Sequence, residues 1–83
     1  MAIDDQVIRV ISEELGISRG IISTKSDLIS ELGADESDMI AIMKATEYKF
    51  HIKISDENWS KMRTVRDIAH LVDVYLEIKQ IEM

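Results

Sequence analysis

Apolar residues recur at helical spacing in three stretches of the chain, and the spacing is lost between them. The first stretch comprises Ile3, Val7, Ile8, Ile11 and Leu15. Repeats of three and four positions place apolar side chains on one face of a helix. Gly16 follows at a position where helices commonly end, so the pattern predicts a first helix over residues 3–15.

The second stretch lies in the middle of the chain and begins at a polar turn. Gly33 suits a tight turn, and Asp35 followed three residues later by Asp38 has the spacing of a capping box. The apolar positions after this turn are Met39, Ile40, Met43 and Phe50. They predict an amphipathic helix with this face inward and Lys44, Tyr48 and Lys49 in solvent.

The third stretch comprises Val65, Ile68, Ala69, Val72, Tyr75 and Leu76. Thr64 and Asp67 again have capping-box spacing, so we predict a final helix from about residue 65 to about residue 80. Residues 51–55 alternate briefly like a strand but have no second strand to pair with, and we interpret them as an extended connector. Residues 56–62 form at most a short helix, with Trp59 and Met62 facing the core.

Residues 17–34 lack helical spacing and form a long first connection. Its apolar residues are Ile17, Ile21, Ile22, Leu28 and Leu32. Because these side chains need burial, we expect the connection to be ordered against the core. The chain is therefore predicted to be all-α, an irregular antiparallel four-helix bundle with a long first loop and a short third helix, in a single domain spanning residues 1–83. The predicted core includes Ile40, Met43, Phe50, Ile68 and Val72.

Composition narrows the possible functions. At 83 residues there is no room for a second core, and without cysteine the fold depends on apolar residues, which make up 46% of the chain. A formal charge of −6 opposes nucleic-acid binding and favours basic partner proteins. No secretory signal or apolar run long enough to span a membrane is apparent, so we expect a cytoplasmic monomer.

The sequence contains no recognisable catalytic or metal-binding pattern. No nucleophile, base and orienting group can be assembled, and a domain of this size offers little concave volume, so we predict that the chain is not an enzyme. His51 and His70 stand apart without ligand spacing, and residues 35–38 lack the alternating oxygen ligands of a calcium loop. We therefore predict no catalytic residue and no metal site.

The turn Leu32-Gly33-Ala34-Asp35, leading into an amphipathic helix that ends in Phe50, resembles the second helix of acyl carrier proteins. The resemblance runs nearly end to end, because Leu15-Gly16-Ile17 and Thr64-Val65 also match that family. It implies an acyl-carrier-protein-like bundle that presents an acyl group or similar cargo to fatty-acid, polyketide or related biosynthetic enzymes. It also implies a partner-binding surface, which here would contain Asp35, Glu36, Asp38, Met39 and Glu47.

One position departs from the family pattern. In that family the turn reads Gly-Ala-Asp-Ser-Leu-Asp, and a phosphopantetheinyl transferase attaches 4'-phosphopantetheine to its serine. Here Glu36 stands in the serine's place and Ser37 in the leucine's. Ser37 is the remaining candidate for attachment, although registering the motif on it would place Asp38 where the family has leucine. The sequence thus leaves two alternatives, a carrier loaded through Ser37 and a non-carrying homologue that acts as a protein-interaction or regulatory module.

Overall fold

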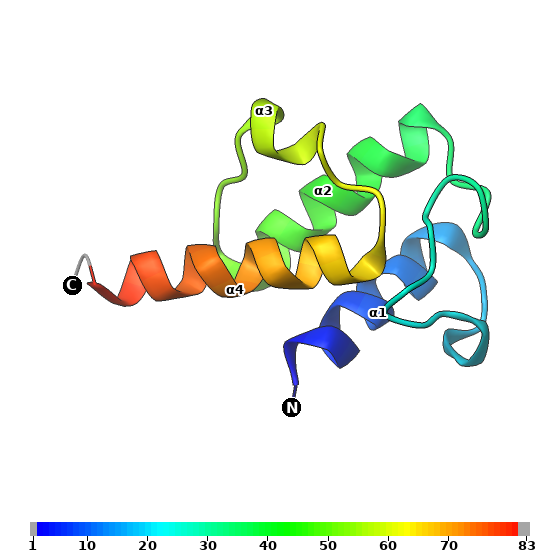
Figure 1. Cartoon of the computed structure of the whole chain (residues 1–83), viewed down its shortest axis with the longest axis horizontal. Coiled ribbons are helices and arrows are strands. Elements are labelled where there is room, and N and C mark those ends of the chain that lie inside the picture. Colours follow the sequence, from blue (N-terminus) through cyan, green and yellow to red (C-terminus); the bar gives the residue numbers. More distant parts are fainter. Residues whose placement is uncertain (1, 82–83) are drawn as a thin grey trace.

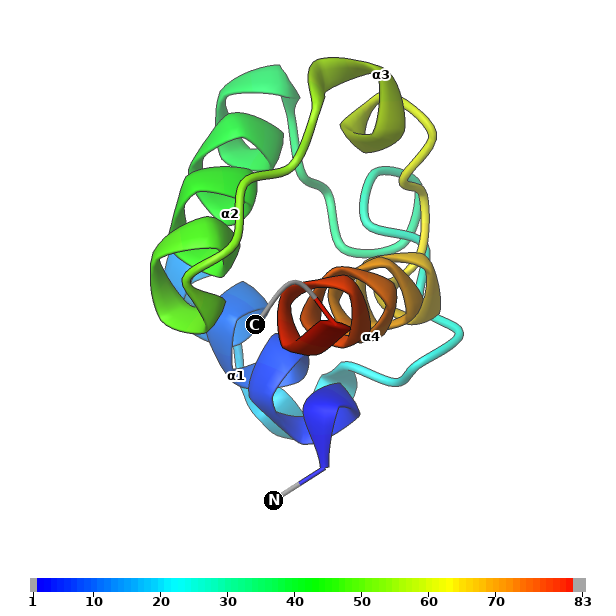
Figure 2. The same ribbon diagram turned by 90° about the vertical axis from the view of Figure 1, so that its left-hand side faces the viewer.

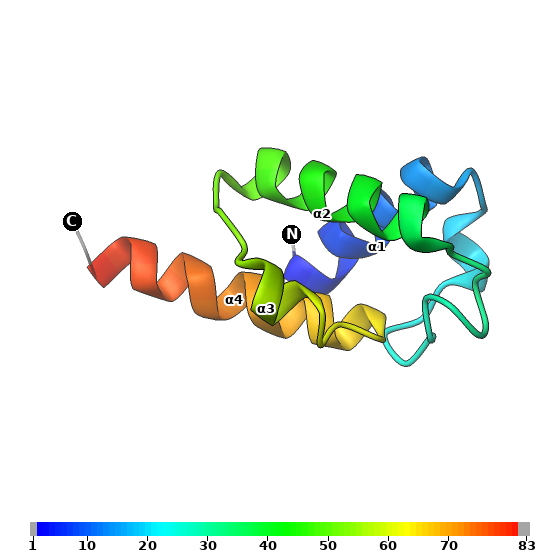
Figure 3. The same ribbon diagram turned by 90° about the horizontal axis from the view of Figure 1, so that it is seen from above.

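The computed structural model describes residues 2–81, and within them the chain forms helices without any β-strand (Figure 1). The helices are α1 (Ile3–Leu15), the 3₁₀-helix η1 (Arg19–Ile21), α2 (Glu36–Phe50), α3 (Asp56–Trp59) and α4 (Val65–Ile81). The predicted all-α bundle with a short third helix is confirmed. Helix α1 packs against both α2 and α4 and runs in roughly the opposite direction to them (Figures 1 and 3). The connector and α3 lead from the end of α2 back to the start of α4, so α2 and α4 run in the same general direction (Figure 1).

Helix ends are set by the residues that the sequence pattern singled out. Gly16 adopts the left-handed conformation with φ 67° and closes α1. Thr64 and Asp67 form a capping box at the start of α4, because the Asp67 amide donates to Thr64 Oγ1 and the Thr64 amide donates to Asp67 Oδ2. At the end of α2, His51 occupies the left-handed region with φ 56°, which is uncommon for a residue with a β-carbon.

The core lies between α1, α2 and α4 and is closed by the connector and α3 (Figure 2). Its buried side chains are Val7, Ile11, Ile22, Leu28, Ala34, Ile42, Phe50, Ile54, Trp59, Val65, Ile68, Ala69 and Val72. As predicted, Phe50, Ile68 and Val72 lie in the core. Met43, which was also predicted to lie there, is half-buried and packs against the core.

Two residues predicted to be buried are exposed instead. Ile40 is 43% exposed, and the core position that was expected for Ile40 is occupied by Ile42. Successive residues are about 100° apart around a helix, so the buried face of α2 follows Ile42, Thr46 and Phe50 and leaves Ile40 outside it. Ile21 is 64% exposed because it ends the 3₁₀-turn, while Ile22 points into the core.

The long connection between α1 and α2 is ordered by backbone pairing with the segment before α4. Asp27 and Thr64 form an isolated antiparallel bridge, and the amide of Leu28 donates to the Arg63 carbonyl at 2.8 Å. A further bond of 2.8 Å runs from the Arg66 amide to the Thr24 carbonyl. These bonds hold the turn that leads into α2 in a fixed place.

Candidate functional site

The start of α2 is fixed by a reciprocal pair of hydrogen bonds. The Asp38 amide donates to Asp35 Oδ1 at 2.8 Å, and the Asp35 amide donates to Asp38 Oδ2 at 3.1 Å. This confirms the predicted capping box. Gly33, with φ 75°, makes the tight turn just before it, and the amide of Ala34 donates to the Leu28 carbonyl at 2.9 Å.

Capping by Asp35 makes Glu36 the first residue of the helix and Ser37 the second. Both side chains are exposed. Within the described residues, neither side chain makes a hydrogen bond or an ion pair. The carboxylates of Asp35 and Asp38 are occupied by the cap, so Glu36 holds the free carboxylate of this turn.

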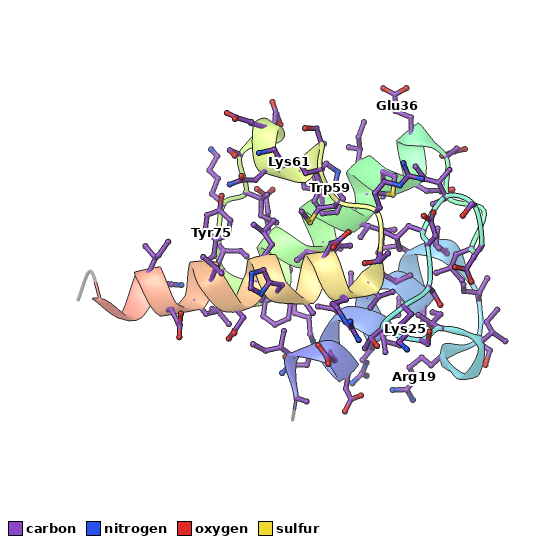
Figure 4. The ribbon with its side chains drawn as sticks, in the orientation of Figure 1. Arg19, Lys25, Glu36, Trp59, Lys61 and Tyr75 are labelled. Carbon is purple, nitrogen blue, oxygen red and sulfur yellow. The ribbon has the colours of Figure 1, made fainter. Side chains whose placement is uncertain are left out.

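An apolar groove runs between the start of α2 and the end of α3 and has a volume of about 480 Å³. We call it the α2 groove, and its lining residues are Ile29, Ala34, Asp35, Glu36, Met39, Ile40, Trp59, Ser60 and Met62. Figure 4 shows Glu36 projecting from the start of α2 at the rim, with Trp59 beneath α3. Ser37 is not among the lining residues, because one residue along a helix turns the side chain by about 100°.

The exposed isoleucines Ile29 and Ile40 both line the α2 groove. Sequence reasoning missed this groove, since helical spacing within α2 does not show where α3 and the first connection lie. Trp59, predicted to face the core, is buried and also forms one wall. The rim is thus charged and the walls are apolar, a combination suited to binding rather than to catalysis.

The five residues predicted to bind partners do not form one cluster. Asp35, Glu36, Asp38 and Met39 lie together at the start of α2, and Met39 is half-buried along the groove. Glu47 lies three turns away. Its Oε2 accepts a hydrogen bond of 2.7 Å from the Ile54 amide, so this carboxylate anchors the connector after α2.

Helix α3 is held over the groove by Tyr75 of α4. The Tyr75 hydroxyl accepts hydrogen bonds from Asn58 Nδ2 at 3.0 Å and from the Ser55 amide at 3.4 Å. These bonds, led by the one from Asn58, lower the pKa of Tyr75 below its ordinary value. Trp59 in the same short helix is therefore positioned by a contact that lies outside the groove.

Residues 2–81 bring no three His, Asp or Glu side chains together in an arrangement that could hold a metal ion. Nor does any described helix have the length and apolar character needed to cross a membrane.

Comparison with known proteins agrees with the fold. A model of the family described as "Phosphopantetheine attachment site" matches residues 5–72. The acyl carrier protein of Bdellovibrio bacteriovorus is 37% identical over 79 residues, covering 95% of this chain and 96% of that protein. This chain belongs to the acyl carrier protein family.

Other relatives extend the similarity. The acyl carrier protein of Wolinella succinogenes is 34% identical over 73 residues, covering 88% of this chain and 96% of the relative. A solved structure of "a putative acyl carrier protein" from Mycobacterium tuberculosis superposes with a TM-score of 0.84 at 27% identity, covering 89% of this chain and 99% of that chain. The fold is that of an acyl carrier protein, and members of this family are carriers rather than enzymes.

Proposed function

We propose that this acyl-carrier-protein-like domain docks on biosynthetic enzymes of the fatty-acid, polyketide or a related class, and that it does so without a covalently attached 4'-phosphopantetheine arm. One observation carries the proposal. The capping box between Asp35 and Asp38 fixes the start of α2, so the first helical residue, at the rim of the α2 groove, is Glu36.

The chemistry of attachment supports an unloaded domain. The transferase must align a hydroxyl with the phosphate of coenzyme A, and a carboxylate offers no such nucleophile. The Ser37 hydroxyl lies one position further along the helix, outside the residues that line the groove. Moving Ser37 to the first helical position would require the Asp35–Asp38 pair of hydrogen bonds to break.

Charge supports docking on a basic surface. The chain has a formal charge of −6, and the first turn of α2 has acidic residues at Glu36 and Asp38, directly after the capping Asp35. Complementary charge accelerates association and selects partners. The Glu36 carboxylate places one negative charge where the family's phosphodiester would place one, so a partner that recognises that charge would still find it. The domain would then act as an interaction or regulatory module on such enzymes.

Co-expression with a promiscuous phosphopantetheinyl transferase, followed by intact-mass measurement, tests this function. The wild-type chain should keep its unmodified mass, whereas Glu36→Ser should gain the mass of the arm. Ser37→Ala serves as the matched control and should behave like the wild type. If Glu36→Ser also stays unmodified, recognition of the α2 surface by the transferase is the obstacle, and acidic residues introduced at Ala41 and Tyr48 are the next change to test.

A second candidate is a conventional carrier loaded on Ser37. Its supporting observation is that the Ser37 side chain is exposed in the first turn of α2 and its hydroxyl makes no hydrogen bond within the described residues. The second candidate would be favoured if the wild-type chain gained the arm and Ser37→Ala did not.

For either candidate we predict a cytoplasmic monomer. Cell fractionation can check the location, and light scattering can check the oligomeric state.

A further inference from the structure

A second groove lies at the opposite end of α2 and has a volume of about 310 Å³. It is formed by the connector after α2 and the last turns of α4, and we call it the basic groove. Its lining residues are His51, Ile52, Lys53, Tyr75, Ile78 and Lys79. None of them is acidic, although acidic residues outnumber basic ones 16 to 10 in the chain.

The basic groove is held in shape by a contact between two helices. Lys79 Nζ donates a hydrogen bond of 2.8 Å to the His51 carbonyl, which joins the last turns of α4 to the end of α2. Tyr75, one turn earlier on α4, reaches the start of α3 through Asn58 and Ser55. Figure 4 shows Tyr75 directed from α4 toward the connector. Three helices therefore position the walls of this groove.

Ordinary helix stabilisation explains only part of this group of residues. A cation near a helix C-terminus interacts favourably with the helix dipole, and this accounts for Lys79 beside the end of α2. It does not account for Lys53, which is exposed in the connector beyond the helix. Nor does it account for Ile78, an apolar side chain of α4 that is 46% exposed and lines the same groove.

Among the described residues, Glu47 and Glu77 are the acidic residues to consider near the basic groove, and each is engaged or turned away. Glu47 accepts a hydrogen bond from the Ile54 amide. Glu77 lies two positions before Lys79 on α4, and residues two apart on a helix do not face each other. Within the part of the chain that the structure describes, the basic groove therefore combines positive charge that has no ion-pair partner with exposed apolar surface.

From this combination we infer that the basic groove is a second docking surface, which binds an acidic segment of a partner protein that also carries an apolar side chain. The apolar residue would rest on Ile52 and Ile78, and carboxylates would meet Lys53 and the His51 edge. A flat anionic membrane fits less well. It would also bring the exposed Glu77 of α4 close to anionic headgroups, within a Debye length of about 8 Å, whereas a peptide segment contacts the groove alone.

The two grooves can be occupied together. Helix α2 has 15 residues, and at about 1.5 Å per residue its two ends lie about 20 Å apart. The acidic α2 groove faces a basic partner, and the basic groove faces an acidic one. This inference goes beyond the proposed function and does not depend on the modification state of the chain.

The test uses the full-length protein and a fluorescein-labelled peptide of glutamate, leucine and glycine residues, with fluorescence anisotropy as the measurement. A control peptide has lysine in place of each glutamate. The acidic peptide should bind, and its affinity should decrease as the salt concentration rises from about 50 mM to about 200 mM. The control peptide should not bind. Backbone amide chemical shifts should change most at residues 51–53 and 78–79.

Matched variants locate the binding surface. Lys53→Glu should weaken peptide binding about tenfold, and Ile78→Ser about fivefold. Lys44→Glu makes the same charge change on an exposed part of α2 outside both grooves, and it should alter affinity less than about twofold. Unchanged thermal unfolding of each variant shows that the fold is retained.

Three results would overturn the inference. One is absence of binding by the acidic peptide, and another is equal loss of affinity in Lys53→Glu and Lys44→Glu. The third is a protein that does not bind the peptide but sediments with phosphatidylglycerol vesicles, and whose sedimentation is abolished by Lys53→Glu. That result would identify the basic groove as a membrane-binding surface instead.

Discussion

The hydroxyl of Tyr75 accepts a hydrogen bond of 3.0 Å from the side-chain amide of Asn58, and this bond ties α4 to α3. Because α3 has only four residues, it depends on such contacts for its position. The same short helix contains Trp59, which forms a wall of the α2 groove. A contact on the far side of α3 therefore helps to shape the groove.

Tyr75→Phe removes this acceptor and should lower the free energy of unfolding by about 0.5–1.5 kcal/mol. Urea unfolding followed by circular dichroism measures the change, and emission from Trp59, the only tryptophan, reports the position of α3. Tyr48→Phe is the matched control, since Tyr48 is 84% exposed and makes no hydrogen bond within the described residues. Equal effects of the two changes would show that the bond to Asn58 contributes nothing.

Asp35→Ala should destabilise the protein by about 0.5–2 kcal/mol, because the Asp38 amide in the first turn of α2 loses its side-chain acceptor. Thermal or urea unfolding measures this loss. Glu36→Ala removes a neighbouring carboxylate that accepts no hydrogen bond and should change stability by less than about 0.5 kcal/mol. If Glu36→Ala were the more damaging change, the assigned start of α2 would be wrong.

Phe50→Ala should cost about 3–5 kcal/mol, because the ring is buried at the end of α2 and its removal leaves a cavity. Ile40→Ala should cost far less, since that side chain lines the α2 groove and is 43% exposed. Comparing the two unfolding free energies tests the rotation of α2 about its axis. A larger loss for Ile40→Ala would contradict it.

Asp67 makes stability depend on pH at the acidic end. Burial alone would raise the pKa of Asp67, but hydrogen bonds from the backbone amides of Thr64 and Arg63 outweigh burial and hold the pKa below its ordinary value. The charged carboxylate therefore stabilises the fold above the unfolded-state pKa of about 3.9, and this contribution is lost as pH falls through the folded-state pKa.

The difference in unfolding free energy between the wild type and Asp67→Asn should accordingly be present at neutral pH and should shrink as the pH falls below about 4. Urea unfolding over a series of pH values measures it. A difference that stays constant through the acidic range would mean that the charge of Asp67 is not what stabilises the start of α4.

Local signals in the sequence predicted the helices well. Gly16 and the capping pairs at Asp35 and Thr64 act within one turn of chain, so their spacing alone indicates where α1 ends and where α2 and α4 begin. The phase of α2 was harder to predict. Thr46 is buried, and its hydroxyl is satisfied there by a hydrogen bond of 2.7 Å that it donates to the Ile42 carbonyl, but a polar residue in the sequence does not indicate a buried face.

Features that join distant segments were not predictable from spacing. The α2 groove needs Ile29, Met39 and Trp59 to meet, and these residues belong to three different parts of the chain. Glu47 was assigned to partner binding from its place on α2, yet its carboxylate binds the Ile54 amide. Such contacts depend on the tertiary arrangement rather than on any pattern within one element.

The backbone pairing of residues 24–28 with residues 63–66 also bears on the order in which the protein folds. The paired segments are separated in the chain by α2, the connector and α3, so closing this contact early would cost much chain entropy. We expect α1 and α2 to form first and the pairing to form late. In pulsed hydrogen exchange, the amides of Leu28 and Arg66 should become protected after those of the helices, and simultaneous protection would contradict this order. Transient opening of the same pairing would then free the turn that holds Glu36 before the rest of the molecule unfolds.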